Sequence, residues 1–273
     1  MGTIVLTGAS DGIGAAAAVE FSQLGHAVLA TGRSQQKLDA VHARMVEAAP
    51  AGVQVPEPIA ADLAAMDDVR DLAEQVLARC ATIDVLANNA GLQARRRQTS
   101  PDGFELDFAV NHLAPFLLTN LLLERLQASH GRVVTTSSVA HRFGGIDFDD
   151  LQMERRWRVL SSYGRSKLAN IWFTSELARR TGVPATCFHP GTVATQLGRG
   201  TPGAGVLEPL ARLVVRSPEA GADTLVWLAT SDEGAHPNAT YYRNRKPGRL
   251  SSRARDAEAA ERLWDVSAQL VGL

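Results

Sequence analysis

Thr3-Ile4-Val5-Leu6-Thr7-Gly8-Ala9-Ser10-Asp11-Gly12-Ile13-Gly14 is the stretch that decides the fold. The apolar, β-branched run over 3–7 predicts a buried strand, and the glycines after it predict a tight turn into an alanine-rich helix over 12–24. Such a turn lets the backbone approach a pyrophosphate, which the N–H groups at the helix start would bind. The sequence therefore predicts a dinucleotide site formed by Gly8, Ser10, Asp11, Gly12, Ile13 and Gly14.

The rest of the chain alternates short apolar runs with longer helical patterns. Strands are predicted at 26–31, 53–60, 83–87, 131–137, 183–188 and 239–242, and helices at 35–48, 66–79, 103–127, 161–181, 217–230 and 255–271. This alternation predicts an α/β fold with one Rossmann-type, doubly wound parallel sheet of about seven strands and helices on both faces. We expect residues 1–273 to form a single dinucleotide-binding domain, with substrate loops near 92–104, 141–160 and 194–216.

The composition argues against several classes of function. The net charge of −1 gives no reason to expect a nucleic-acid partner, and no run of about 18–20 apolar residues could span a bilayer. The strand at 3–7 leaves no room for a signal peptide, so we expect a cytoplasmic protein without a membrane anchor. Cys80 and Cys187 are predicted to be buried thiols, and the seven histidines lack metal-ligand spacing, so no metal site is expected.

Tyr163 and Lys167 form the most informative pair in the sequence. Their four-residue spacing places both on one face of the predicted helix, where an ammonium group beside a phenol favours the phenolate. A tyrosine with a lowered pKa can act as a general acid and base near neutral pH. The alternative is an exposed helix with a cation–aromatic contact. The chain has only three tyrosines, and its only lysines are Lys37, Lys167 and Lys246, so an accidental pairing is rare.

Residues after the second and third strands predict contacts with an adenosine. Gly32 stands where an acid would bind the ribose of NAD, and Arg33 could clamp a ribose 2′-phosphate. We therefore expect NADP to be preferred, with NAD as the alternative, although a surface arginine is also compatible with the pattern. Asp62, followed by Leu63, could meet the adenine edge or cap the next helix.

Polar residues follow or interrupt three further apolar elements. Asn89, Ala90 and Gly91 follow the fourth strand, Asn111 lies in the long helix over 103–127, and Ser138 ends the fifth strand. Such residues are more often hydrogen-bonded core residues than catalysts. Here each is expected to face the same crevice as the Tyr163–Lys167 pair, beyond the carboxyl ends of the strands.

Taken together, these motifs resemble the short-chain dehydrogenase/reductase family. The resemblance rests on TGxxxGxG at 7–14, NNAG at 88–91, Asn111, Ser138, YxxxK at 163–167 and the turn at Pro190-Gly191, in order over nearly the whole chain. The stretches Val110-Asn111-His112-Leu113, Ser166-Lys167-Leu168-Ala169-Asn170 and Arg262-Leu263-Trp264-Asp265 look like the retinol dehydrogenase and WW-domain oxidoreductase branch.

The resemblance implies a role for each catalytic candidate. Tyr163 would exchange a proton with the substrate oxygen, Ser138 would hydrogen-bond that oxygen, and Lys167 would tune the phenol and hold the nicotinamide ribose. Asn111 would distort its helix and hold a water that links Lys167 to solvent. The cofactor contacts implied after the sixth strand are Pro190, Gly191, Val193 and Thr195.

The expected activity is NADP(H)-dependent hydride transfer that interconverts an alcohol and a carbonyl on a largely apolar small molecule. A catalytically silent NAD(P)-binding sensor or scaffold is the alternative, and the intact catalytic set argues against it. A sugar-nucleotide epimerase or dehydratase is disfavoured by the glycine spacing. Arg95-Arg96-Arg97 is either a solvated loop or a contact for an anionic substrate. The helix predicted at 255–271 packs on the core, covers the active site or joins the subunits of a homo-oligomer.

Overall fold

The computed structural model describes residues 2–191, 217–236 and 239–273. Its strands are β1 (Thr3–Leu6), β2 (Ala27–Gly32), β3 (Ile59–Ala60), β4 (Val85–Asn88), β5 (Arg132–Thr136), β6 (Ala185–His189), β7 (Tyr241–Arg243) and β8 (Lys246–Pro247). The α-helices are α1 (Gly12–Gln23), α2 (Gln35–Ala48), α3 (Met66–Arg79), α4 (Leu106–Phe108), α5 (Ala114–Leu121), α6 (Leu123–Ala128), α7 (Val159–Thr181), α9 (Pro218–Thr230) and α10 (Ala257–Val271). A π-helical turn, η1, spans Ala109–Leu113, and 3-10 turns are η2 (Val139–Phe143), η5 (Asp232–Ala235) and η6 (Arg253–Arg255).

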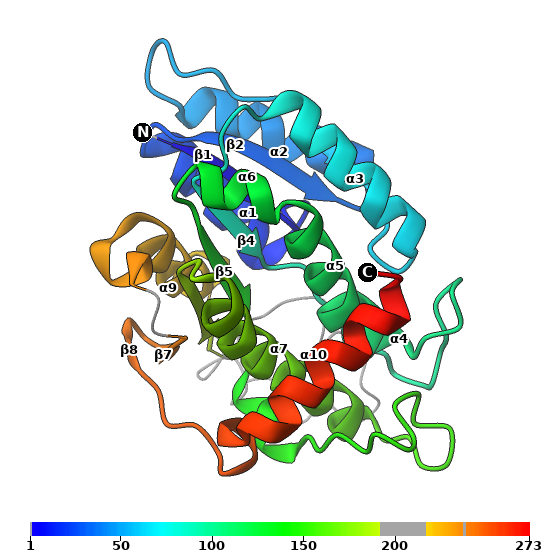
Figure 1. The fold of residues 1–273 in the computed structure, drawn as a ribbon. Helices are drawn as coiled ribbons and strands as arrows, with labels where there is room; N and C mark the ends of the chain where they lie inside the picture. The colour runs from blue at the N-terminus through cyan, green and yellow to red at the C-terminus, as the bar shows by residue number, and fades with distance from the viewer. Residues whose placement is uncertain (1, 192–216, 237–238) are drawn as a thin grey trace, which may run out of the picture.

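The strands form one sheet in the order β3-β2-β1-β4-β5-β6-β7-β8, and helices cover both of its faces (Figure 1). Strands β1 to β7 pair in parallel, while β8 pairs antiparallel with β7. The predicted doubly wound α/β fold is confirmed, and the short strand β8 adds an antiparallel edge to it.

The strand order reverses around β1, which pairs with β2 on one side and β4 on the other. Val5 of β1 is opposite Leu29 of β2 and Leu86 of β4. Ligands of open parallel sheets bind beyond the carboxyl ends of the strands at such a reversal. The turns that follow β1 and β4 therefore lie side by side at the place where a cofactor is expected.

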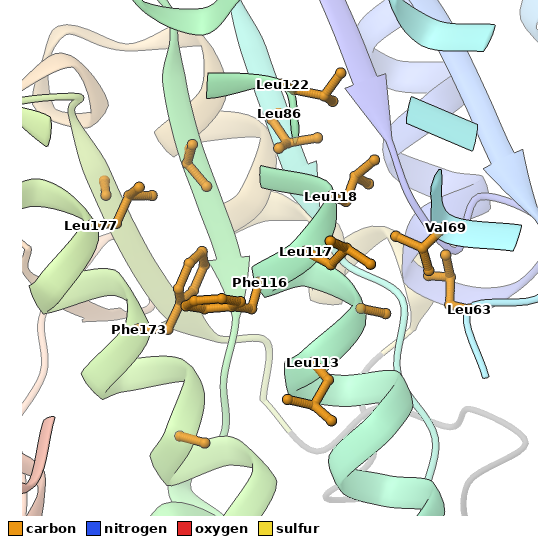
Figure 2. Close-up of a cluster of buried hydrophobic side chains, with 14 of the residues drawn as sticks. Leu63, Val69, Leu86, Leu113, Phe116, Leu117, Leu118, Leu122, Phe173 and Leu177 are labelled. Atoms are coloured by element: carbon orange, nitrogen blue, oxygen red, sulfur yellow. The ribbon is translucent and has the colours of Figure 1, made fainter. Parts of the chain in front are cut away.

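Two apolar cores lie on opposite faces of the sheet. One packs α3, α5, α7 and α10 against it, and the other packs α1, α2 and α9. Ile4, Val5 and Leu6 are all fully buried, because successive side chains enter opposite cores. Figure 2 shows part of the first core, in which the rings of Phe116 and Phe173 meet with centroids 5.8 Å apart.

The strand predicted at 53–60 is much shorter in the structure. Only Ile59 and Ala60 pair with β2, opposite Thr31 and Gly32. The preceding segment contains Pro56 and Pro58, which have no N–H group to donate to a strand ladder. The prolines therefore limit β3 to two residues.

The continuous helix predicted at 103–127 is also wrong, because the chain forms α4, η1, α5 and α6 over this region. Pro115 lies at the start of α5. Its nitrogen cannot donate to the carbonyl of Asn111 four residues earlier, and its ring crowds that carbonyl. The widened π-helical turn therefore contains Asn111, the residue for which a helix distortion was expected.

Helix α10 crosses α7 and α5 on one face of the molecule (Figure 1). Leu263 is 1% exposed, and the ring of Trp264 packs on Phe116 with centroids 4.9 Å apart. Ser267 of α10 hydrogen-bonds the buried His112 of η1, with Oγ 2.9 Å from Nε2. The end helix thus packs on the core and on the turn that holds Asn111. No helix in the described parts of the chain is long and apolar enough to cross a membrane.

Candidate active site

The glycine turn between β1 and α1 is closely packed. Gly8 (φ +69°) and Gly12 (φ +54°) lie in the left-handed backbone region. A Cβ on Gly14 would lie 2.0 Å from the carbonyl oxygen of Gly8. Asp11 caps α1, since the N–H group of Gly12 donates to its Oδ1 at 2.8 Å. Glycine at these positions gives the close backbone approach that a pyrophosphate needs at a helix N-terminus.

The turn after β4 is tied directly to the glycine turn. Thr7 Oγ1 accepts hydrogen bonds from the N–H groups of Asn89 and Ala90, both at 3.1 Å. Asn89 Nδ2 donates to the Thr7 carbonyl at 3.0 Å. A Cβ on Gly8 would lie 2.7 Å from Ala90 Cα, so the two turns touch. These contacts tie the two neighbouring turns together.

The residues expected to meet the adenosine surround the start of α2. Gly32 lies against Ser10, because a Cβ there would be 3.0 Å from Ser10 Oγ. Arg33 is exposed and makes no ion pair with another described residue. Lys37 Nζ lies 2.8 Å from Asp11 Oδ2, which places a second cation beside the glycine turn. No local pattern in the sequence indicates this position of Lys37, because its partner Asp11 is 26 residues away in the chain.

Asp62 and Leu63 serve structural roles in the turn after β3. The N–H group of Ala64 donates to Asp62 Oδ1 at 3.1 Å, which closes a local turn. Asp62 is not the cap of α3, whose N-cap residue is Ala65. The side chain of Leu63 is buried in the core (Figure 2), so a cofactor at this position would meet the turn rather than that side chain.

Tyr163 and Lys167 project from α7 toward the end of β5. Lys167 Nζ lies 5.5 Å from the centre of the Tyr163 ring and donates to the Thr136 carbonyl at 3.1 Å. Ser138, two residues after β5, lies close enough to the Tyr163 phenol to lower its pKa. Gly164 makes this approach possible, because a Cβ there would lie 2.6 Å from the carbonyl oxygen of Ala140. The three side chains form one contiguous polar group.

The protein alone does not lower the pKa of the Tyr163 phenol. Burial raises this pKa to about 12, the hydrogen bond from Ser138 acts in the opposite direction, and the charge of Asp107 adds to the rise. Burial lowers the pKa of Lys167 to about 8, and Asp107 opposes that change. The expectation that Lys167 lowers the tyrosine pKa is therefore wrong for the protein by itself.

Asn111 joins the π-helical turn to the loop after β4 and to α7. Its Nδ2 donates to the Leu92 carbonyl at 2.8 Å and to Ser166 Oγ at 2.9 Å, while its Oδ1 accepts from the Leu92 N–H group at 2.8 Å. Ser166 Oγ donates in turn to the carbonyl of Tyr163 at 2.8 Å. The asparagine amide is thus held on both sides, and its orientation is fixed.

Gly91 marks the point where these groups converge. A Cβ on Gly91 would lie 3.2 Å from Asn111 Oδ1 and 3.2 Å from Lys167 Nζ. The two side chains therefore flank one position, and Lys167 in turn lies over the Tyr163 ring. The structure brings together the four predicted catalytic residues, Asn111, Ser138, Tyr163 and Lys167, from η1, the end of β5 and α7.

The turn after β6 lies at the same end of the sheet. Pro190 and Gly191 follow β6 directly, and Gly191 has φ +89°. Val193, Thr195 and the predicted substrate loop at 194–216 lie outside the described residues.

The two other predicted substrate loops pack together. Arg97 Nη2 donates to the Gln152 carbonyl at 3.1 Å and lies 3.8 Å from Glu154 Oε1. Arg95 and Arg96 are exposed. The loop predicted at 141–160 is shorter than expected, because η2 runs to Phe143 and α7 begins at Val159.

A family model described as short chain dehydrogenase matches residues 2–202. The chain belongs to the short-chain dehydrogenase family. This short-chain dehydrogenase is 39% identical to "Retinol dehydrogenase 13" of Homo sapiens over 285 residues, which cover 99% of the chain and 85% of that protein. It is 42% identical to "Putative daunorubicin C-13 ketoreductase DnrU" of Streptomyces sp. (strain C5) over 274 residues, which cover 99% of the chain and 92% of that protein.

Solved structures share the fold. A crystal structure of a protein from Mycobacterium Paratuberculosis is 35% identical with a TM-score of 0.79, covering 99% of this chain and 93% of that one. A short chain dehydrogenase from Shigella flexneri 2a, complexed with NADP, is 25% identical with a TM-score of 0.66, covering 86% of this chain and 93% of that one. The protein is thus an NAD(P)-dependent oxidoreductase of the retinol dehydrogenase-like branch that acts on CH–OH or C=O groups.

Proposed function

We propose that this short-chain dehydrogenase interconverts an alcohol and a carbonyl on a largely apolar small molecule, with NADP(H) as cofactor and Tyr163 as general acid and base. The observation that carries the proposal is the convergence of Asn111, Ser138, Tyr163 and Lys167 beside the glycine turn. Polar side chains with fixed hydrogen bonds at the carboxyl ends of β4 and β5 suit a site where a proton and a hydride move together.

Each side chain has a chemical task that its position supports. When bound, the nicotinamide ring supplies the hydride transfer to or from the substrate carbon. Tyr163 gives its phenolic proton to the carbonyl oxygen during reduction and takes the hydroxyl proton during oxidation. Ser138, whose hydroxyl lies close enough to Tyr163 to lower the pKa of its phenol, orients the substrate oxygen. Lys167 holds the nicotinamide ribose, and Asn111 fixes the loop after β4 around it.

Charge from the oxidised cofactor offsets the effect of burial on Tyr163. The folded chain holds the pKa of the phenol at about 12, which favours the protonated acid needed for carbonyl reduction. A positive nicotinamide near the phenol favours the phenolate needed for alcohol oxidation. The site is therefore suited to reduction by itself and becomes suited to oxidation when the oxidised cofactor binds.

The preference for NADP rests on two cations beside the glycine turn. Arg33 follows β2 without an acidic residue at Gly32, and Lys37 is held near the turn by its 2.8 Å contact with Asp11. Cations at these positions can bind a ribose 2′-phosphate, which NAD lacks. The related short chain dehydrogenase from Shigella flexneri 2a was crystallised with NADP.

The apolar character of the substrate rests on exposed side chains near Tyr163. Val159 and Leu160 lie one turn before Tyr163 on α7 and are 37% and 49% exposed, and Phe143, at the end of η2, is 61% exposed. Exposed apolar groups near a reactive site favour apolar ligands. Two relatives are named for retinol and for daunorubicin.

Turnover of a carbonyl and alcohol panel that includes retinal, retinol and daunorubicin, with NADPH or NADP, tests this function. Replacing Tyr163 by Phe removes the proton-transfer group, so kcat is expected to fall by about 10²–10⁴-fold while NADPH still binds. Tyr241→Phe is the matched control, because the Tyr241 hydroxyl is buried without a hydrogen-bond partner among the described residues. Full activity in Tyr163→Phe, or no turnover of any panel member by the wild type, contradicts the proposal.

A further inference from the structure

A cluster of buried charged groups lies beside Tyr163 and has no place in the catalytic set. Glu105 and Asp107 come from the segment at the start of α4, and Ser162 and Arg165 come from α7 on either side of Tyr163. Glu105, Asp107 and Ser162 are 0% exposed, and Arg165 is 1% exposed. Buried charges are costly and need a balancing interaction or a function.

The two carboxyl groups differ in their partners. Glu105 Oε2 accepts from Arg165 Nη2 at 2.9 Å and from the Phe108 N–H group at 3.0 Å, and Oε1 accepts from Trp157 Nε1 at 3.1 Å. Among the described residues, the hydrogen-bond donors that contact Asp107 are neutral: the Ala94 N–H group donates to Oδ1 at 2.7 Å, and the Ser162 hydroxyl lies 3.1 Å from Oδ2. Glu105 is therefore balanced by a cation at contact distance, and Asp107 is not.

The hydroxyl of Ser162 bridges these carboxyl groups and fixes the number of protons. Ser162 Oγ lies 2.9 Å from Glu105 Oε1 and 3.1 Å from Asp107 Oδ2. A serine hydroxyl carries one hydrogen, so it can donate to only one of two carboxylates. Both contacts are hydrogen bonds only when one carboxyl group is protonated. Because Glu105 is paired with Arg165, the proton belongs on Asp107.

The electrostatics agree with this proton count. Burial raises the pKa of Asp107 to about 7, the charge of Glu105 adds to the rise, and the Ala94 N–H group, Ser162 and Arg165 oppose it. Asp107 therefore changes its charge within the ordinary physiological range of pH, although an exposed aspartate would be ionised throughout that range.

Several charged groups surround Asp107 and determine the effect of its ionisation. Glu105 faces it from its own segment, and Arg165, Tyr163 and Lys167 face it from α7, with Asp150 of the neighbouring loop acting on Arg165. A negative charge on Asp107 raises the pKa values of both Tyr163 and Lys167. Ionisation of Asp107 therefore favours the protonated forms of both side chains.

We propose that Asp107 is a positioning residue that stores a proton beside Tyr163. When Asp107 releases this proton to solvent, its negative charge keeps Tyr163 protonated. Alcohol oxidation, which needs the phenolate, is then restrained relative to carbonyl reduction. The proposal rests on the role of Tyr163 given under the proposed function. The buried Glu105–Ser162–Asp107 bridge would then control how the reaction depends on pH. In the described parts of the chain, no hydrogen bond joins Asp107 to Tyr163, so Asp107 acts on Tyr163 through its charge.

Asp107→Asn tests the effect on turnover. An asparagine resembles the protonated aspartate, because its oxygen can accept from the Ala94 N–H group and its amide can donate to Ser162. In alcohol oxidation, the pH of half-maximal kcat/KM is expected to move about one unit lower than in the wild type. The rate of carbonyl reduction at pH 6 stays within about twofold, because Asp107 is already neutral there. The exposed Asp67→Asn is the matched control, and a profile unchanged by Asp107→Asn overturns the proposal.

Unfolding in urea gives a second readout that does not need turnover. Because the pKa of folded Asp107 lies above that of an unfolded aspartate, the folded state binds more protons between about pH 4 and pH 7, and its stability falls as pH rises through this window. Asp107→Asn is expected to lose less stability than the wild type between pH 5 and pH 8. Equal losses of stability in the wild type and in Asp107→Asn would show that Asp107 does not store a proton, and they overturn the proposal whether or not the protein turns over a substrate.

A second variant covers the case in which Asp107→Asn does not fold. Ser162→Ala removes the hydroxyl that bridges Glu105 and Asp107, so the pH at which the fall in stability ends is expected to differ from that of the wild type. A fall at the unchanged pH means that Ser162 does not bridge the pair, and it overturns the proposal.

Discussion

The glycine turn and the buried charged cluster both support the same site, but by different physical means. The glycine turn is held by backbone packing and neutral hydrogen bonds, such as those from Asn89 and Ala90 to Thr7. The cluster beside Tyr163 is held by charged side chains, with Arg165 and Glu105 2.9 Å apart at 1% and 0% exposure. The glycine turn thus depends mainly on shape, and the cluster beside Tyr163 depends on charge.

This difference separates the effects that substitutions have in the two regions. A change in the glycine turn acts through steric contacts, so its effect on cofactor binding is independent of pH. A change in the cluster acts through the balance of buried charges, so its effect appears in stability and in the pH profile. Four substitutions test this division, and they follow in order of expected effect.

Glu105→Ala is expected to have the largest effect. It leaves the guanidinium of Arg165 buried without its 2.9 Å partner, and such a loss costs about 3–5 kcal/mol of the free energy of unfolding. Urea unfolding monitored by circular dichroism measures it. Glu154→Ala is the control, since this exposed carboxylate lies 3.8 Å from Arg97 and its loss is worth about 0–1 kcal/mol. A loss below about 1 kcal/mol in Glu105→Ala would show that Arg165 finds another partner.

Gly14→Ala is expected to abolish most cofactor binding. The new Cβ would lie 2.0 Å from the Gly8 carbonyl oxygen, so the turn must open. Affinity for NADPH should fall more than about 100-fold, which corresponds to about 2.7 kcal/mol. A fluorescence titration with NADPH measures the change at pH 6 and pH 8, and the loss should be the same at both. Gly145→Ala, whose Cβ would approach only Arg253 at 4.0 Å, should bind normally. A loss in Gly14→Ala that varied with pH would contradict the division between shape and charge.

The contrast also explains what could be predicted from the sequence. The glycine turn, NNAG and the Tyr163–Lys167 spacing are local patterns whose structure depends on neighbours in the chain, and the sequence predicts them at the right elements. A helix distortion at Asn111 is implied by the family resemblance. The structure shows that this distortion is a π-helical turn, and Pro115 gives its physical cause. The strand predicted at 53–60 is longer than β3, because the apolar residues of this segment favour a strand and Pro56 and Pro58 prevent most of it from pairing.

The charged cluster could not be predicted in the same way. Glu105 and Arg165 are 60 residues apart in the chain, and nothing in the sequence pairs one arginine of this arginine-rich chain with one glutamate. The pKa of Tyr163 depends likewise on burial and on Asp107, neither of which is visible in the YxxxK spacing. Electrostatic interactions between residues far apart in the chain thus determine the part of the site that local sequence patterns could not predict.

Arg33→Ala is expected to have a moderate effect on the cofactor side. Loss of one charge-assisted contact to a 2′-phosphate weakens NADPH binding by about 10-fold and leaves NADH binding unchanged. Titrations with both cofactors measure the ratio. Arg44→Ala, on the exposed surface of α2, is the control. An equal loss for both cofactors would mean that Arg33 does not distinguish them.

Gly91→Ala is expected to have the smallest effect, and it connects the two regions. Its Cβ would lie 3.2 Å from both Asn111 Oδ1 and Lys167 Nζ, and the flexible end of Lys167 can yield by a few tenths of an ångström. We expect kcat to fall about threefold with less than about 1 kcal/mol change in stability. Steady-state kinetics and urea unfolding measure the two quantities. An unchanged kcat would show that the position of Lys167 is not critical.

The hydrogen bond between His112 and Ser267 bears on how the enzyme is made. The two residues are 155 positions apart in the chain, so a ribosome adding about 5–20 residues per second adds the second roughly 8–30 s after the first. Throughout this interval the turn that holds Asn111 lacks the helix that packs on it. In a nascent chain, the turn that holds Asn111 therefore gains this support only after residues 257–271 have emerged from the ribosome.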